Sequence, residues 1–277
     1  MTLDRARPYT VVTGASSGVG AELAKGLAAR GHALVLVARR KDRLEELARE
    51  IRSRRGTPVD ARQCDLADRE QRADLTSELA NSNVAVLCNN AGFPTCGPLL
   101  DSDPAREAAE VEVNVVAMHE LTLAVLPGMV ARRSGAILIT GSNAGEQPVP
   151  TAATYAASKA FANAFAESLH EELLGTGVSC TLLEPGPIRT EFATIGGIRA
   201  GENHIWMGWK SPTSVAEAAI KAMERGRRTV IPGPLAKFQA YGGRYLPRAL
   251  LMPIITRKIL PALRGEDDLD AARLSRK

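Results

Sequence analysis

The sequence predicts an α/β fold, an open and doubly wound parallel sheet with helices on both faces. Apolar runs such as ALVLVA at 33–38, VAVLC at 84–88 and AILIT at 136–140 alternate with longer amphipathic segments. Continuous apolar strands between helices are typical of a parallel sheet that is covered on both faces. No internal linker divides residues 1–231, so we expect one domain there, followed by a C-terminal helical appendage over 232–277.

The elements follow one another in regular order. Strands are assigned to short runs rich in apolar and β-branched residues, at 9–13, 33–38, 59–64, 84–88, 136–140 and 178–183. Helices are assigned to the segments between them, where apolar residues recur three or four positions apart, at 18–30, 42–54, 68–80, 104–126, 154–173 and from about 212. This alternation predicts a sheet whose ligands bind at the carboxyl ends of the strands.

The composition limits the classes of partner. The chain of 277 residues has 35 basic and 31 acidic residues, and a formal net charge of +4 is too small to indicate nucleic-acid binding. Its four cysteines form no C-x-x-C pair and its four histidines no H-E-x-x-H motif, so no metal site is expected. Isolated cysteines suit a reducing compartment, and no secretory signal is visible, so we expect a cytoplasmic protein.

The first strand is followed by TGASSGVG, residues 13–20. Its glycines would let the backbone turn tightly and approach a ligand, and the next helix would offer free N–H groups to phosphate. This turn therefore predicts a site for the phosphates of a dinucleotide. The residues expected to contact the cofactor there are Gly14, Ser16, Ser17, Gly18, Val19 and Gly20.

Arg39 and Arg40 end the second strand. At this position of a nicotinamide-binding fold an acidic residue binds the ribose 2′-hydroxyl, whereas arginine accommodates a 2′-phosphate. The nearest acid, Asp42, lies further along the chain. The two arginines could be a solvated charge cluster at a helix start, but their location favours NADP(H) over NAD(H).

The third and fourth strands also end in residues suited to a cofactor. Asp65 could accept a hydrogen bond from the adenine amino group, or it could cap the next helix. Small residues after the fourth strand allow the backbone to approach the cofactor. The contacts expected at these two strand ends are Asp65, Leu66, Asn90, Ala91 and Gly92.

Residues 155–159 read YAASK. On a helix, Tyr155 and Lys159 lie one turn apart on the same face, with only small residues between them. A free tyrosine has a pKa of roughly 10, and a nearby cation lowers this pKa by favouring the phenolate. The pair could therefore provide an acid or base, or it could be a contact without a chemical role.

These stretches together resemble the short-chain dehydrogenase/reductase family. The matching stretches, in chain order, are TGASSGVG (13–20), NNAG (89–92), VNVVA with Asn114, ITGSNAG with Ser142, YAASK (155–159) and PGPIRT (185–190). The resemblance covers residue 9 to about residue 231. It implies a Rossmann-like fold, a nicotinamide cofactor and redox chemistry between carbonyls and alcohols.

The resemblance also implies residue roles. Tyr155 would exchange a proton with the substrate oxygen, and Ser142 would hydrogen-bond that oxygen. Lys159 would lower the pKa of Tyr155 and bind the nicotinamide ribose, while Asn114 would hold a water that links Lys159 to solvent. Thr190 would contact the nicotinamide carboxamide. The other cofactor contacts implied after the sixth strand are Pro185, Gly186 and Ile188.

The expected function is an NADP(H)-dependent oxidoreductase acting on an apolar carbonyl or alcohol, assembled as a homodimer or homotetramer. The resemblance implies that residues 187–210 form a lid over the substrate, and an apolar substrate is inferred from their glycines and apolar residues: Phe192, Ile195, Ile198, Ile205, Trp206, Met207 and Trp209. These apolar residues could instead form a hydrophobic cluster that supports the fold. One alternative is an NADP(H)-binding sensor without turnover. Another is a scaffold or membrane-surface protein whose tail is the functional part.

The appendage contains YLPRALLMPIITRKILPAL at 245–263. Basic residues interrupt its apolar residues, and prolines at 247, 253 and 261 break any long helix. Short pieces that pack on the protein's own substrate cleft or on a neighbouring subunit are favoured. Contact with a membrane surface, which amphipathic basic helices can also make, is the alternative.

Overall fold

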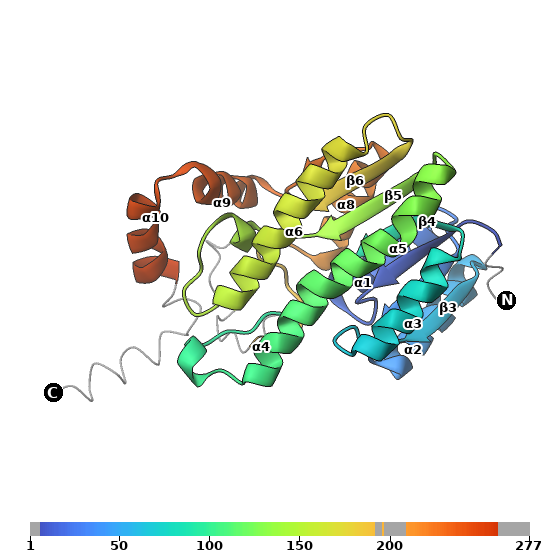
Figure 1. Ribbon diagram of the computed structural model, residues 1–277, viewed down its shortest axis with the longest axis horizontal. Helices are drawn as coiled ribbons and strands as arrows, with labels where there is room; N and C mark the ends of the chain where they lie inside the picture. Colours follow the sequence, from blue (N-terminus) through green and yellow to red (C-terminus); the bar gives the residue numbers. More distant parts are fainter. Residues whose placement is uncertain (1–5, 192–195, 197–208, 260–277) are drawn as a thin grey trace.

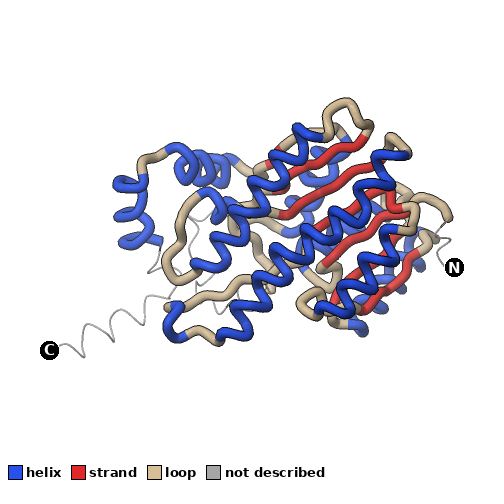
Figure 2. The backbone as a smooth tube through the Cα atoms, in the orientation of Figure 1, coloured by secondary structure: helices blue, strands red, loops and turns tan. Residues whose placement is uncertain are grey.

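A parallel sheet forms the middle layer of the molecule (Figures 1 and 2). The computed structural model describes residues 6–191, 196 and 209–259. Within these residues the sheet has seven strands, in the order β3-β2-β1-β4-β5-β6-β7. They are β1 (Tyr9–Thr13), β2 (Leu34–Ala38), β3 (Val59–Gln63), β4 (Val84–Asn89), β5 (Gly135–Thr140), β6 (Val178–Leu183) and β7 (Thr229–Val230). The predicted doubly wound parallel sheet is confirmed, although β7, only two residues long, was not predicted.

Helices cover both faces of the sheet (Figure 1). One face carries α3 (Arg69–Ala80), α5 (Met118–Ala131) and α6 (Ala153–Glu172), and the other carries α1 (Gly18–Ala28), α2 (Lys41–Arg55) and α8 (Pro212–Glu224). Neighbouring residues of one strand serve different faces, since Val11 lies in the first core and Val12 in the second. Both side chains are fully buried, which explains why the strands read as continuous apolar runs.

The helix expected at 104–126 continues to Ala131 as α4 (Pro104–Val111), η2 (Glu112–Ala117, a π-helical turn) and α5. The continuation passes through Pro127, which lies inside α5. Pro127 lies on the exposed side of α5, and buried residues such as Met129 hold the last turn on the core. By length and composition alone this helix, Pro104–Ala131, could cross a membrane, but the core helix of a soluble protein meets the same criteria.

The order of the strands reverses beside β1. The chain runs outward from β1 to β2 and β3, then returns to pair β4 with the other side of β1. In sheets of this kind ligands bind in the crevice outside the carboxyl ends of the strands at the reversal. The fold therefore brings the residues that follow β1 and β4 together.

The predicted C-terminal helices are present as α9 (Pro234–Tyr245) and α10 (Arg248–Ile254), followed by the short turn η5 (Ile255–Ile259). They lie beyond the carboxyl ends of β5 and β6 (Figure 1), where α9 packs on the turn η3 (Asn143–Glu146). Another short turn, η1, spans Leu99–Asp101. The division into a domain ending at 231 and an appendage stays a prediction.

Candidate active site

A pocket of about 520 Å³ opens at the carboxyl ends of the central strands. Its volume is within the usual range for small-molecule and cofactor sites. It is lined by fourteen of the residues predicted from the sequence: Gly14, Ser17, Gly18, Val19, Asn90, Ala91, Gly92, Ser142, Tyr155, Lys159, Pro185, Gly186, Ile188 and Thr190. The predicted residues outside this lining are Ser16, Gly20, Arg39, Arg40, Asp65, Leu66 and Asn114.

The glycine-rich turn joins β1 to α1 against the end of β4. Gly14 has a φ of 66°, and a Cβ there would lie 2.9 Å from the Cα of Ala91, so both the conformation and the close approach require glycine. The Asn90 side chain donates to the Thr13 carbonyl at 3.0 Å and holds the two strand ends together. The Ser17 side chain does not cap α1, which leaves the first N–H groups of the helix free to bind an anion.

Arg40, rather than Arg39, lies against this turn. The Arg40 guanidinium donates to the hydroxyl of Ser16 at 3.0 Å and to that of Ser17 at 2.7 Å, whereas Arg39 is exposed. The direction in which each side chain leaves the end of β2 decides this difference.

Glu191 joins the same arginine cluster from the segment after β6. Its carboxylate pairs with Arg40 at 2.9 Å and with Arg43 at 2.7 Å. Hydrogen bonds from Arg43 and Arg40 lower the pKa of Glu191, so it stays ionised. An anion that binds these guanidinium groups must compete with Glu191.

Asp65 does not cap the next helix, so that alternative is wrong. α3 is capped by Asp68, whose carboxylate accepts from the backbone N–H groups of Glu70 and Gln71. Asp65 instead accepts from the N–H of Ala67 at 3.0 Å. An adenine contact of Asp65 stays a prediction, while Leu66 is buried in the core.

Tyr155 and Lys159 lie on one face of α6, as predicted. The Lys159 ammonium is 5.9 Å from the centre of the Tyr155 ring and donates to the Thr140 carbonyl at 2.8 Å. A hydrogen bond joins the hydroxyls of Tyr155 and Ser142. The helix that begins at Ala153 therefore brings the tyrosine and the lysine to the end of β5, where Ser142 lies.

The direction predicted for the tyrosine pKa was wrong for this structure. Burial raises the pKa of Tyr155, and the hydrogen bond with Ser142 opposes this rise without cancelling it. Burial also lowers the pKa of Lys159 to about 8, against the smaller attraction of Glu110. Desolvation is the largest effect on both groups, although only Lys159, at 4% exposed, is fully buried; Tyr155 is partly buried and lines the pocket.

Asn114 lies behind the pocket wall. It is buried in the π-helical turn, where its carbonyl oxygen accepts from the Phe93 N–H at 3.1 Å. Its amide donates to the Phe93 carbonyl and to the Ser158 hydroxyl, both at 3.0 Å. Asn114 thus fixes the residue before Lys159. Its predicted role in holding a water stays a prediction.

The C-terminal helices supply an apolar wall that motif analysis did not assign to the site. The lining residues missed from the sequence include Cys96, Val149, Phe238, Leu246, Leu251 and Ile254. The expectation that the appendage packs on the protein's own cleft was the one available signal. Of the predicted lid, Trp209 lines the pocket, whereas the other apolar residues named for it lie outside the described residues.

The sheet order and the strand-end pocket are those of the Rossmann-like class. Residues 8–195 match the family model described as short chain dehydrogenase. The chain belongs to the short-chain dehydrogenase/reductase family. Members of this family are oxidoreductases that use a nicotinamide cofactor and act on alcohol or carbonyl groups.

Individual relatives cover most of the chain. A very-long-chain 3-oxoacyl-CoA reductase of Bos taurus is 34% identical over 225 residues, which is 80% of this chain and 70% of the relative. A short-chain dehydrogenase from Sphingobium yanoikuyae, solved with NADPH, is 32% identical with a TM-score of 0.79, over 89% of this chain and 95% of that one. A bulky-bulky ketone specific alcohol dehydrogenase from Comamonas testosteroni is 26% identical with a TM-score of 0.73, over 92% and 94%.

Proposed function

We propose that this protein is an NADP(H)-dependent oxidoreductase that interconverts an apolar carbonyl and its alcohol, with Tyr155 as the acid or base. The observation that carries the proposal is a single pocket bounded by the glycine-rich turn, the Ser142–Tyr155–Lys159 group and an apolar helical wall. The free N–H groups of α1 and the close approach of Gly14 to Ala91 fit a dinucleotide. Turnover with panels of ketones and alcohols, followed by nicotinamide absorbance, tests it.

The chain's own residues would bind, orient and protonate the substrate. A bound nicotinamide would supply or accept the hydride. Tyr155 is the proton donor to the carbonyl oxygen, and Ser142 holds that oxygen by a hydrogen bond. The raised pKa of Tyr155 keeps its proton in place at neutral pH, which suits reduction. Lys159 would bind the ribose hydroxyls of the cofactor, and Thr190 would contact its carboxamide.

The preference for NADP(H) is proposed from the arginine cluster. Arg40 lies on the serines of the glycine-rich turn, and Arg43 lies one helical turn further on. Guanidinium groups bind phosphate through paired, charge-assisted hydrogen bonds. The NADPH in the Sphingobium yanoikuyae structure is a further support.

Arg40→Ala is expected to weaken NADPH binding by roughly 10- to 100-fold and to change NADH binding little, because a charge-assisted hydrogen bond contributes about 1.5–3 kcal/mol. Titration of each protein, followed by cofactor fluorescence, measures the dissociation constants of NADPH and NADH. Arg39→Ala is the matched control, since its side chain is exposed at the adjacent position. Glu191→Gln should act oppositely and tighten NADPH, because it removes the competing carboxylate. An equal loss of both cofactors in Arg40→Ala would refute the assignment.

An apolar substrate is proposed from the wall formed by α9 and α10. Phe238, Leu246 and Leu251 line the pocket beside the hydrogen-bonding group of Ser142 and Tyr155. This arrangement gives one polar end for the reacting oxygen and an apolar surface for the rest of the molecule. The names of the relatives that act on very-long-chain 3-oxoacyl-CoA and on bulky ketones agree with such a substrate.

The outer side of α9 and α10 is proposed to contact an anionic membrane surface, at the cytoplasmic side. Three large apolar side chains of this segment are exposed and lie outside the pocket lining: Tyr241, Tyr245 and Leu250. Residues 234–259 contain five basic residues and no acidic one; Arg244 pairs with Glu146 and Glu167 and Arg248 donates to the Glu146 carbonyl, which leaves Lys237, Arg257 and Lys258 as the remaining charges. A second copy on a twofold axis would bring these like charges together, whereas anionic lipid complements them. A homodimer or homotetramer would then form through another face, which light scattering tests.

Replacing Tyr241, Tyr245 and Leu250 together by serine is expected to reduce binding to phosphatidylserine vesicles by at least about ten-fold, because apolar side chains lose their burial in lipid. These three are 53%, 73% and 62% exposed and do not line the pocket. Leu174→Ser is the control, a residue 65% exposed just after the carboxyl end of α6. Vesicle co-sedimentation measures the loss. Equal binding by parent and triple variant, or a change of oligomer instead, would disprove membrane contact.

A further inference from the structure

The backbone of Ser142 is clamped by one side chain of α6. The Ser142 N–H donates to the Asn163 carbonyl oxygen at 3.2 Å, and the Asn163 amide donates back to the Ser142 carbonyl at 2.9 Å. Both residues are buried. A Cβ at Gly141 would lie 2.0 Å from the Asn163 oxygen, so the loop can approach α6 only because residue 141 is glycine. Asn163 therefore fixes where the serine hydroxyl lies.

Glu146 fixes the orientation of this asparagine. Its carboxylate accepts a second hydrogen bond from the Asn163 amide at 2.9 Å. Two acceptors on one NH₂ group keep the amide from turning over, and the carbonyl oxygen then faces the Ser142 N–H. The Glu146 side chain is only 10% exposed, so its charge needs a partner.

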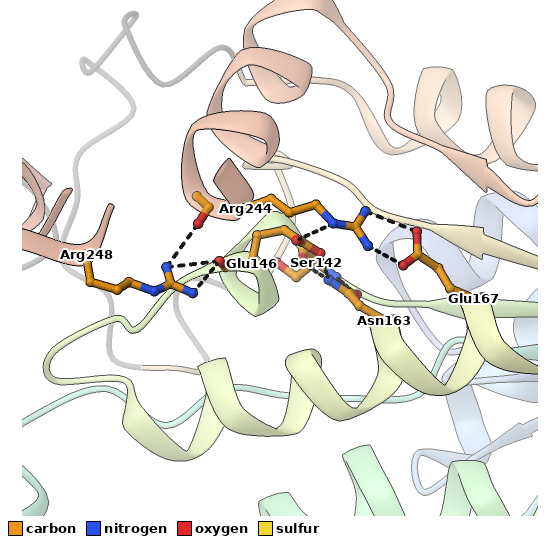
Figure 3. Close-up of polar contacts among 7 residues, drawn as sticks. Ser142, Glu146, Asn163, Glu167, Arg244 and Arg248 are labelled. Atoms are coloured by element: carbon orange, nitrogen blue, oxygen red, sulfur yellow. Dashed lines mark hydrogen bonds and ion pairs between the residues drawn. The ribbon is translucent and has the colours of Figure 1, made fainter. Parts of the chain in front are cut away.

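That partner comes from the C-terminal helix α9. The Arg244 guanidinium lies 3.7 Å from the Glu146 carboxylate. It also forms a bidentate salt bridge with Glu167 of α6, in which one of the two hydrogen bonds is 3.1 Å long. Arg248 adds hydrogen bonds of 3.2 and 3.1 Å to the Glu146 carbonyl. Figure 3 shows the chain of contacts running from Arg244 through Glu146 and Asn163 to Ser142.

We propose that Arg244 is a positioning residue for Ser142. It holds Glu146 between α9 and α6, Glu146 orients Asn163, and Asn163 fixes the loop that carries the serine hydroxyl. The C-terminal helices thus have a second role besides lining the pocket, which is to keep the serine in place. The catalytic consequence rests on the proposed function, but the mechanical coupling between α9 and the loop does not.

Arg244→Met keeps most of the aliphatic stem and removes the guanidinium. Arg228→Met is the matched control, because Arg228 pairs with Glu171 at 3.5 Å, one turn along α6 from Glu167, and is not part of this chain of contacts. Hydrogen exchange of residues 141–147 is the first readout. Four successive amides there, those of residues 142–145, have acceptors in the structure, so their protection is measurable.

The loop amides are expected to exchange at least about three-fold faster in Arg244→Met and at the parent rate in Arg228→Met. For the carbonyl substrate, kcat should fall about ten-fold with NADPH affinity unchanged, less than the 10²–10³-fold typical of deleting such a donor outright. Arg244→Lys should restore part of the loop protection and part of kcat. The double variant Glu146→Gln/Arg244→Met should lose little more kcat and protection than Glu146→Gln alone, because both changes act on the same chain of contacts.

Unchanged loop exchange, faster exchange in both arginine variants, or faster exchange with normal kcat would each overturn the inference. A parent protein without turnover on any carbonyl would instead disprove the proposed function. In that case the exchange difference between the two arginine variants still decides whether Arg244 is coupled to the loop.

Discussion

Tyr155→Phe is expected to reduce turnover of the carbonyl substrate by at least about 10²- to 10⁴-fold, the range that general acid catalysis contributes. The change removes the hydroxyl that would donate the proton and that is hydrogen-bonded with Ser142, but it leaves the ring in place. NADPH affinity should therefore stay close to that of the parent protein. Steady-state absorbance measures turnover, and fluorescence titration measures cofactor binding.

Tyr9→Phe provides a matched control for the same chemical change. Tyr9 is 1% exposed in β1, and its hydroxyl is buried without a hydrogen-bond partner. Removing that hydroxyl should leave turnover unchanged and stability equal or slightly higher, because a buried polar group without a partner is a cost. Near-normal turnover of Tyr155→Phe, or an equal loss in both variants, would contradict the proposed acid role.

The parts of the site that could be predicted from the sequence depend on local geometry. Helical spacing alone puts Tyr155 and Lys159 on one face of α6, and the same spacing in the residues after the glycine-rich turn predicts that α1 begins there. The parallel sheet follows in the same way from continuous apolar strands. These features need only the period of each element and the rule that strand ends meet at one edge.

The features that could not be predicted from the sequence depend on tertiary contacts. The choice of Arg40 over Arg39 is set by which side chain leaves β2 toward the serines of the turn. The contribution of Phe238 to the pocket depends on where α9 packs against η3, beyond the carboxyl ends of β5 and β6. No pattern within either segment carries that information, because both depend on contacts with residues far away in the chain.

The pKa of Tyr155 shows most clearly what sequence spacing leaves out. Sequence spacing placed a cation near the phenol, and a cation favours the phenolate. The structure adds burial, which opposes the charged form of both groups and raises the pKa of Tyr155 while lowering that of Lys159. Which effect is larger depends on how much water the folded site excludes, and spacing along one helix cannot report it.

Burial of Lys159 has a consequence for stability. Its pKa is about 8 in the fold against an ordinary value of 10.5, so between these values the unfolded chain binds more protons than the folded one. Stability therefore rises with pH through this window as far as Lys159 is concerned. The destabilising contribution is complete below pH 8 and vanishes above about 10.5. The lysine is kept at this cost because the proposed chemistry needs its charge.

Lys159→Met is accordingly expected to abolish most turnover, by at least about 10²-fold, and to change the pH dependence of stability. The free energy of unfolding of the variant, relative to the parent, should fall by roughly 2 kcal/mol between pH 7.5 and 9.5, because only the parent gains from deprotonating the lysine. The hydrogen bond to the Thr140 carbonyl is also lost, but to a first approximation that loss adds a constant and leaves the slope unchanged.

Denaturant unfolding of the cofactor-free proteins at several pH values measures this difference. Comparing variant with parent cancels the contributions of the other buried groups, such as the cysteine thiols whose pKa values burial raises. Lys41→Met, at a lysine that is 60% exposed, controls for the loss of one lysine from the chain. A parent–variant difference that stays flat from pH 7.5 to 9.5 would mean that Lys159 is not desolvated. Retained turnover in Lys159→Met would mean that Lys159 has no part in the proposed mechanism. Its buried ammonium would then only destabilise the fold.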